Sequence, residues 1–259
     1  MPSVPRRVSI IAFLAIAALS PETAAAQLSA DQVLGRMDEL QRRNKSESAL
    51  IEMRLFDGDR EVQRRELIVL SRTDDNGQTG AFVEFTSPPD IRGLRLLTIQ
   101  TGSDDDQRIY LPALRRIQRI AGSSREDRFA GSDLSYEDLR VRDRNDYTSR
   151  MVDSTDSAWT IESDPKDDES PYSRIVAEID KVRYAITRAR YFDKKGRLTK
   201  ILTASDFERY GSDVWKASKI TMEDVREDRR TELVYRERDL DTEISPDVFS
   251  DRYLRRGVQ

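Results

Sequence analysis

The chain has 259 residues and a net charge of −4 at pH 7, and 36% of its side chains are charged. It contains neither cysteine nor histidine, which excludes disulfides, zinc sites built from these residues, and catalysis by Cys–His or Ser–His pairs. The acidic balance argues against a general nucleic-acid-binding protein, which carries an excess of basic residues. We therefore expect no nucleic-acid partner, no metal and no cofactor, and an enzyme would have to rely on carboxylate, Lys or Tyr chemistry.

The first 26 residues have the order of a secretory signal peptide. Two arginines precede an uncharged run over 8–19, and three alanines end the segment at Ala26. An apolar core of roughly 7–15 residues is typical of such peptides, whereas a membrane-spanning helix needs about 20. A retained anchor is the alternative. We expect cleavage after Ala26, a mature chain that begins at Gln27 in the periplasm, and one domain over 27–259.

The mature chain is predicted to open with an amphipathic helix. Ser29 and Gln32 form a capping-box pattern. Apolar residues then recur on one face at helical spacing, and these are Val33, Leu34, Met37 and Leu40. Such a helix can cover a cavity as a lid, or it can pack on a sheet as an ordinary amphipathic helix. The sequence leaves both interpretations open.

Apolar and polar side chains alternate from residue 49 onward, which is the period of β-strands. The pattern predicts strands over 49–55, 66–71, 81–85 and 94–100. The acidic run Asp104–Asp106 lacks the spacing of a calcium loop, and we expect a solvated turn there. Short strands separated by turns favour an antiparallel sheet over βαβ units.

The middle of the chain is basic. Strands are predicted on both sides of a turn at 112–114, followed by a short helix over 131–139 with Ser132 or Asp133 as its N-cap. Six arginines oppose two acidic residues between positions 108 and 128. A solvated strand face is the simpler interpretation of this positive island. The alternative is recognition, because the guanidinium fork suits phosphate and carboxylate. The candidates for contact with a lipid headgroup or a partner are Arg115, Arg116 and Arg119.

The C-terminal half is predicted to be mostly strand. Residues 145–156 are interpreted as a strand pair, 163–171 as a polar loop, and 174–186 as either strand or helix. A hairpin turn follows at 193–196. Three further strands are predicted over 201–207, 215–222 and 232–238, before a turn into a terminal segment at 244–250.

Two motifs in the middle of the chain resemble a known family. Residues 110–117 read YLPALRRI and residues 129–139 read FAGSDLSYEDL. Together with the segments 85–93, 191–196 and 246–254, they resemble the periplasmic outer membrane lipoprotein-sorting proteins, the LolA-like family. The resemblance implies a mainly β fold with some α, an unclosed antiparallel β-barrel with covering helices. It also implies an apolar cavity for the acyl chains of a lipid or lipoprotein. An inner-membrane exporter of the resistance-nodulation-division type is the partner it suggests.

Apolar positions of the predicted strands supply candidates for the lining of that cavity. They are Met53, Leu55, Phe85, Leu96 and Ile99. Alternation alone does not separate a hollow barrel from one that side chains fill.

Three functions from different classes follow. The leading hypothesis is a monomeric carrier, without catalytic residues, that shields acyl chains during transfer towards the outer membrane. The second is a periplasmic adaptor subunit of a transporter that carries no cargo. The third is a hydrolase that uses Glu137 with Asp138, but adjacent residues on a helix point about 100° apart and would not face each other.

Overall fold

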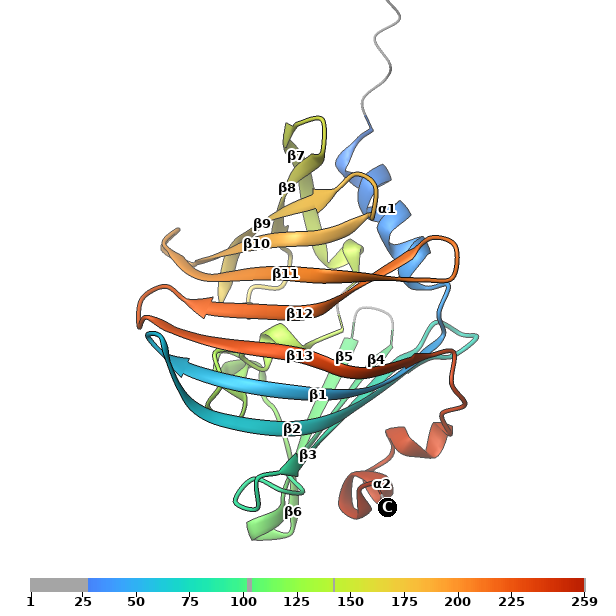
Figure 1. Cartoon of the computed structure of the whole chain (residues 1–259), viewed down its shortest axis with the longest axis vertical. Coiled ribbons are helices and arrows are strands. Elements are labelled where there is room, and N and C mark those ends of the chain that lie inside the picture. The colour runs from blue at the N-terminus through green and yellow to red at the C-terminus, as the bar shows by residue number, and fades with distance from the viewer. Residues whose placement is uncertain (1–27, 102–103, 142, 259) are drawn as a thin grey trace, which may run out of the picture.

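One antiparallel sheet of 13 strands dominates the computed structural model, which describes residues 28–101, 104–141 and 143–258. The predicted signal peptide and its cleavage site lie outside these residues. The strand order β6-β5-β4-β3-β2-β1-β13-β12-β11-β10-β9-β8-β7 consists of two meanders that meet where the first strand pairs with the last. Figure 1 shows these strands stacked along the long axis of the molecule.

The strands and helices have the following bounds. The first meander contains β1 (Ser46–Asp57), β2 (Arg60–Thr73), β3 (Thr79–Ser87), β4 (Arg95–Thr101), β5 (Asp104–Leu111) and β6 (Arg116–Arg119). The second contains β7 (Tyr147–Ser154), β8 (Ala158–Pro165), β9 (Tyr172–Asp180), β10 (Ala185–Asp193), β11 (Leu198–Tyr210), β12 (Val214–Asp224) and β13 (Arg229–Leu240). The helices are α1 (Ala30–Gln41) and α2 (Asp251–Arg256), with 3₁₀ turns η1 (Pro112–Leu114), η2 (Gly122–Ser124), η3 (Phe129–Gly131), η4 (Glu137–Leu139), η5 (Arg144–Asp146) and η6 (Pro246–Phe249).

The sheet is strongly curved but not closed. Asp138 pairs with Lys200 on β11, and Arg140, two residues further on, pairs with Asp105 on β5, although a flat sheet would hold these strands, seven places apart, at a separation of about 34 Å. The strands must therefore wrap round a shared inner face. Because β6 and β7 each pair with only one strand, the barrel remains open between them. The predicted fold class, an unclosed antiparallel barrel with covering helices, is confirmed.

Helix α1 begins as the sequence predicts. The Ser29 side chain accepts a hydrogen bond from Gln32 N, and the Gln32 side chain accepts one from Ser29 N, which completes the capping box. Val33 is fully buried and packs with Trp159 and Ile161 on β8. The helix covers the upper end of the sheet in Figure 1. Among the described residues, no helix is long and apolar enough to span a bilayer.

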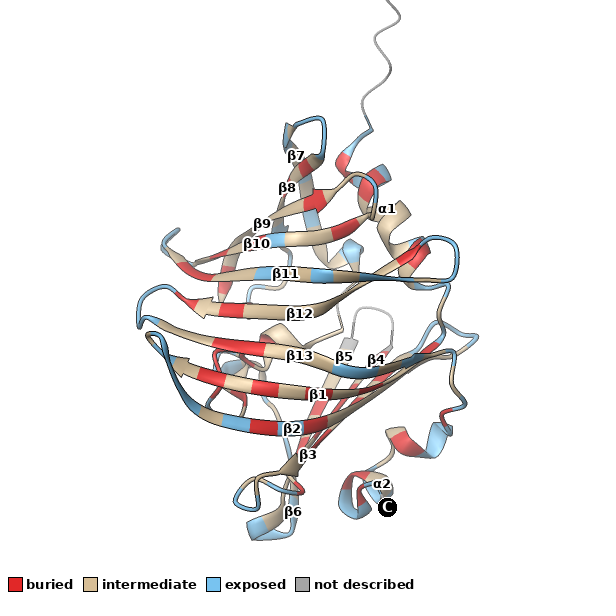
Figure 2. Cartoon of the chain, in the orientation of Figure 1, coloured by how far each residue is buried: buried red, intermediate tan, exposed pale blue. Residues whose placement is uncertain are grey.

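The irregular segment between β6 and β7, residues 120–146, fills part of the inner face, and we call it the plug. Phe129 and Leu134 are buried there against Met53 and Phe85, and the Phe85 and Phe129 rings lie 5.5 Å apart. In Figure 1 the yellow-green plug crosses behind β13 and β1. In Figure 2 buried positions recur along those same strands, which are the ones that the plug covers.

The predicted helix over 131–139 is wrong, since only the single turn η4 forms there. Ser132 and Asp133 are buried, and neither is the N-cap of a helix. The Ser132 hydroxyl donates to Phe129 O, and Asp133 accepts a hydrogen bond of 2.7 Å from the Thr231 hydroxyl on β13. Tertiary hydrogen bonds therefore replace the local caps that the sequence suggested.

The acidic run is not a solvated turn. Asp105 and Asp106 lie within β5. The Asp105 side chain is only 5% exposed and pairs with Arg140 at 2.6 Å and Arg125 at 3.4 Å. Cations from the plug, 20 and 35 residues further along the chain, make burial of this carboxylate tolerable.

Most other predicted strands are confirmed with longer bounds. The predicted strand pair at 145–156 is instead the single strand β7, and β8 extends to Pro165, so the polar loop begins at 166. The segment left open as strand or helix contains β9 and the start of β10.

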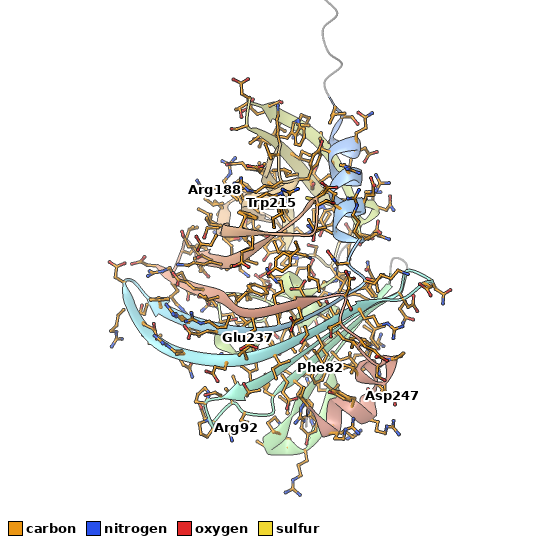
Figure 3. All side chains as sticks on the ribbon, turned by 45° about the vertical axis from the view of Figure 1, so that its right-hand side comes forward. Phe82, Arg92, Arg188, Trp215, Glu237 and Asp247 are labelled. Atoms are coloured by element: carbon orange, nitrogen blue, oxygen red, sulfur yellow. The ribbon has the colours of Figure 1, made fainter. Side chains whose placement is uncertain are left out.

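The C-terminal segment packs on the outer face of the sheet. Phe82 on β3 is fully buried there and meets Tyr253 of α2 edge to face, with ring centroids 5.2 Å apart. Phe249 covers Gly80, where a Cβ atom would lie 2.5 Å from the ring. Figure 3 shows Phe82 beside this segment, which also carries the labelled Asp247. The outer face of β3–β5 is thereby a second, separate core.

Candidate functional site

Two adjoining cavities lie on the inner face of the second meander. One of about 290 Å³ opens between α1, the plug and strands β7–β10. The other, of about 360 Å³, follows the sheet from β10 to β13. The two share a set of lining residues, Met37, Ile186, Ala189 and Tyr191. We call the joint space the inner cavity, and its size is typical of sites for small ligands.

Small side chains on the inner face of the sheet leave space for the inner cavity above them. Five alanines lie there on four different strands: Ala177, Ala185, Ala189, Ala204 and Ala217. Larger apolar side chains form the walls: Ile161, Ile175, Ile179, Leu202, Phe207, Trp215 and Ile220. Figure 3 places Trp215 in the upper half of the sheet, well away from Phe82. The roof is α1, whose Leu34 and Met37 face the floor. The helix is thus both packed on the sheet and a cover over a cavity.

The cavity candidates chosen from the sequence lie elsewhere. Met53, Leu55, Phe85 and Leu96 come together in one cluster that the plug fills, each no more than 4% exposed. Ile99 packs on the outer face and lines a small groove beside Phe249. It is separated from Leu96 because residues three apart on a strand point to opposite faces. None of the five lines the inner cavity.

The end of the inner cavity nearest the plug carries mixed charge. Three acidic and two basic side chains line it: Asp38, Asp138, Asp143, Arg140 and Arg144. Asp138 accepts hydrogen bonds of 2.7 Å from both the Tyr172 hydroxyl and Lys200 Nζ. Burial, then the charge of Asp138, raises the pKa of the Tyr172 phenol well above its ordinary value. Burial likewise raises the pKa of the Asp38 carboxyl, although Arg42 opposes it.

The opposite end lies at β12 and β13 and carries an excess of positive charge. Its charged lining residues are Glu47, Lys216 and Arg238. Arg238 Nε donates to Glu47 Oε1 at 2.9 Å, and Lys216 Nζ lies 3.4 Å from Glu47 Oε2. Neither cation stands out in the sequence, because each is a single basic residue in an ordinary alternating strand. Only the pairing of β12 with β13 brings Lys216 and Arg238 together.

Comparisons with known proteins agree with this geometry. A protein-family model whose description reads "uncharacterized protein" matches residues 77–256. The fold is similar to the crystal structure of an outer membrane lipoprotein-sorting protein domain from Vibrio parahaemolyticus, with 26% identity and a TM-score of 0.79 over 86% of this chain and 97% of that one. It is equally similar to a DUF1329 family protein from Desulfovibrio piger, with 28% identity and a TM-score of 0.79 over 86% and 96% of the chains.

The chain belongs to the family that this model describes, and its structural neighbours are LolA-superfamily and outer membrane lipoprotein-sorting domain proteins. A LolA superfamily protein from Nitrosomonas europaea shares the fold at 20% identity and a TM-score of 0.69, over 88% of this chain and all of that one (100%). A search of the curated proteins finds no match. The resemblance to LolA-like proteins expected from the central motifs is therefore confirmed.

The LolA-like fold is a carrier or binding fold, and the two carboxylates of the hydrolase hypothesis have structural partners here. Glu137 is buried, accepts a hydrogen bond of 3.2 Å from Ser170 and pairs with Arg140 at 3.2 Å. Asp138 is held by Lys200 and by Ser135, whose backbone N–H and hydroxyl both donate to it at 2.8 Å. Asp138 anchors the plug to the sheet, and Glu137 anchors it to the loop between β8 and β9.

The positive island divides into two groups. Arg108, Arg125 and Arg128 form ion pairs with acidic residues of other segments. The three candidates lie at the tip formed by η1 and β6, at the opposite end of the molecule from α1 in Figure 1. All three are exposed, but Arg119 pairs with Asp106 at 2.9 Å. The sequence predicted Arg115 to lie in a strand. It instead follows η1 in a left-handed backbone conformation with φ 49°.

Proposed function

We propose that this LolA-like protein is a periplasmic carrier that shields the acyl chains of a lipid or lipoprotein during transfer towards the outer membrane. The observation that carries the proposal is the inner cavity, a continuous apolar space with an alanine floor and a helical roof. The signal-peptide pattern of residues 1–26 supports a periplasmic location. The structural similarity to a lipoprotein-sorting protein domain from Vibrio parahaemolyticus supports the proposed cargo.

The energetics favour acyl chains as the cargo. Each CH₂ group moved from water into an apolar site stabilises the complex by about 0.8 kcal/mol. The inner cavity, which the plug lines at one end only, can receive such a chain without displacing packed side chains. The filled region around Phe85 and Leu96 cannot, because protein cores pack too densely to admit a ligand.

The experiment compares two neighbouring residues of β11 that face opposite ways. Ala204 lines the inner cavity, whereas Thr203 is exposed. Native mass spectrometry of wild-type protein extracted gently from cells should show a co-purifying lipid. Ala204→Trp fills the cavity and should lose that lipid, and Thr203→Trp, the matched control, should keep it. Equal lipid content in the two variants would contradict the proposed location of the site.

The tip of the molecule favours a second candidate function, that of an adaptor. Leu114 lies in η1, between β5 and β6, and is 61% exposed. Arg115 and Arg116 follow it directly in the chain. An exposed apolar side chain beside exposed cations is suited to an acidic partner. Wild-type protein free of lipid would favour an adaptor that docks on an inner-membrane transporter through this tip. In the carrier proposal, the same tip would contact an exporter of the resistance-nodulation-division type.

A further inference from the structure

We propose that the β12–β13 end of the inner cavity binds the anionic group of the cargo, a carboxylate or a phosphate, through Arg238 and Lys216. This inference rests on the proposed carrier function and adds the headgroup class. Its basis is an imbalance of charge inside an apolar space. Two cations face the cavity, and the one carboxylate beside them, Glu47, is shared by both.

Arg238 is rigidly held and incompletely satisfied. Its side chain is 5% exposed, and Nη2 donates to Ala217 O at 3.1 Å while Nε donates to Glu47. The guanidinium carbon lies 3.8 Å from the centroid of the Tyr235 ring. Its remaining nitrogen, Nη1, is buried without a hydrogen-bond partner among the described residues. A buried charged donor that lacks an acceptor is costly, and an anionic ligand would remove that cost. Glu237, labelled in Figure 3, marks β13 one residue before this position.

Lys216 supplies the second cation and connects the site to the roof. Its Nζ donates to Gln41 Oε1, at the end of α1, at 2.8 Å. An ammonium group has three donors, and Gln41 and Glu47 account for two of them. The described residues supply no third acceptor, so the remaining donor can meet a ligand oxygen. An anion bound here would therefore contact the sheet and be linked through Lys216 to the helix that covers it.

The two ends of the cavity differ in charge, and this difference would determine the orientation of the bound cargo. Acidic residues outnumber basic ones in the lining at the plug end, whereas basic residues outnumber acidic ones at the β12–β13 end. An anionic group is repelled by the first and attracted by the second. The acyl chain would then run from Arg238 over Ala217, Ala204 and Ala189 towards the plug.

The test uses three probes that share one saturated chain: palmitic acid, hexadecyl phosphate and hexadecanol. Delipidated full-length mature protein is titrated with each by calorimetry. We expect at least one anionic probe to bind about tenfold or more tightly than the alcohol, since a charge-assisted hydrogen bond contributes about 1.5–3 kcal/mol. The stronger of the two anions identifies carboxylate or phosphate as the preferred group.

Variants assign this preference to the named residues. Lys216→Met and Arg238→Met should lose most of the preference for the anion while keeping the affinity for hexadecanol. Lys219→Met removes a cation from the same strand where it pairs with Glu232 at 3.0 Å, and it should leave the preference unchanged. Glu47→Gln should strengthen binding of the anion, a gain that misfolding cannot produce, so the inference remains testable even where Arg238→Met fails to fold.

Two results would overturn the inference. Equal affinity of the wild type for all three probes would remove the anionic site but leave the carrier function standing. Binding of no probe would remove the carrier function and the anionic site together.

Discussion

The inner face of this sheet has a filled region and a hollow region built from the same alternating pattern. In the first meander, Met53, Phe85 and Leu96 meet the plug and are almost fully buried. In the second, alanines stand at inward positions, and the plug lines only one end of the space above them. The difference teaches that strand alternation determines which side chains face inward, while their size and an irregular segment determine whether space remains between them.

The charged groups at the boundary keep the two regions apart. The plug is anchored by Arg140, which pairs with Asp105 on β5, and by Asp138, which pairs with Lys200 on β11. Both pairs are largely buried, and breaking such a pair is strongly destabilising. The plug therefore cannot slide into the inner cavity without exposing these charges to an apolar surface.

The largest effect is expected from removing an aromatic ring of the plug. Phe129 is 2% exposed, and Phe129→Ala should lower the free energy of unfolding by about 3–5 kcal/mol. Phe207→Ala, in the wall of the inner cavity, should cost only about 1 kcal/mol, because the ring already borders empty space. Urea unfolding of both variants measures this contrast. Similar losses for the two would show that the two regions are equally packed.

A smaller effect is expected at high pH from Tyr172, at the boundary. Its phenol has a raised pKa in the folded protein, so the folded state keeps a proton that the unfolded state releases above about pH 10. Stability is therefore fully present below pH 10 and falls as pH rises further, by about 1.4 kcal/mol per pH unit for this one group. Tyr172→Phe should have a correspondingly shallower decline in urea-unfolding free energy between pH 10 and 11. An unchanged slope would contradict the assignment.

The smallest effect on stability is expected at the tip, outside both regions. Arg115→Glu with Arg116→Glu should change the free energy of unfolding by less than about 0.5 kcal/mol, because exposed charges contribute little. Association with vesicles that contain anionic phosphatidylglycerol, or with a transporter partner, should nevertheless weaken. The wild-type association should also fall as salt rises, since screening shortens to about 8 Å at physiological ionic strength. Arg188→Glu, at an exposed position on β10 labelled in Figure 3, is the control and should leave association unchanged.

The sequence predicted the parts of the fold that depend on local pattern. Strand alternation and turn residues located most of the sheet, and the capping box at Ser29 located α1. It did not predict which inward positions line a cavity, because Met53 and Ala204 both alternate correctly and differ only in what packs over them. Nor did it predict the burial of Asp105, since the cations that compensate its charge come from distant positions in the plug. Arg238 and Lys216 were missed for the same reason, as their proximity depends on β-pairing between separate strands.

The pairing of the first strand with the last has a consequence for the time course of folding. Lys45 N, just before β1, donates to Asp241, just after β13, across 196 residues of chain. Such non-local pairing makes folding slow. At roughly 5–20 residues per second, a ribosome needs about 10–40 s to make the intervening chain. During that interval β1 has no partner on one side, and the two meanders cannot join. A chain that emerges N-terminus first, from a ribosome or across a membrane, thus remains only partly folded until β13 is available, and one edge of β1 is exposed in the meantime.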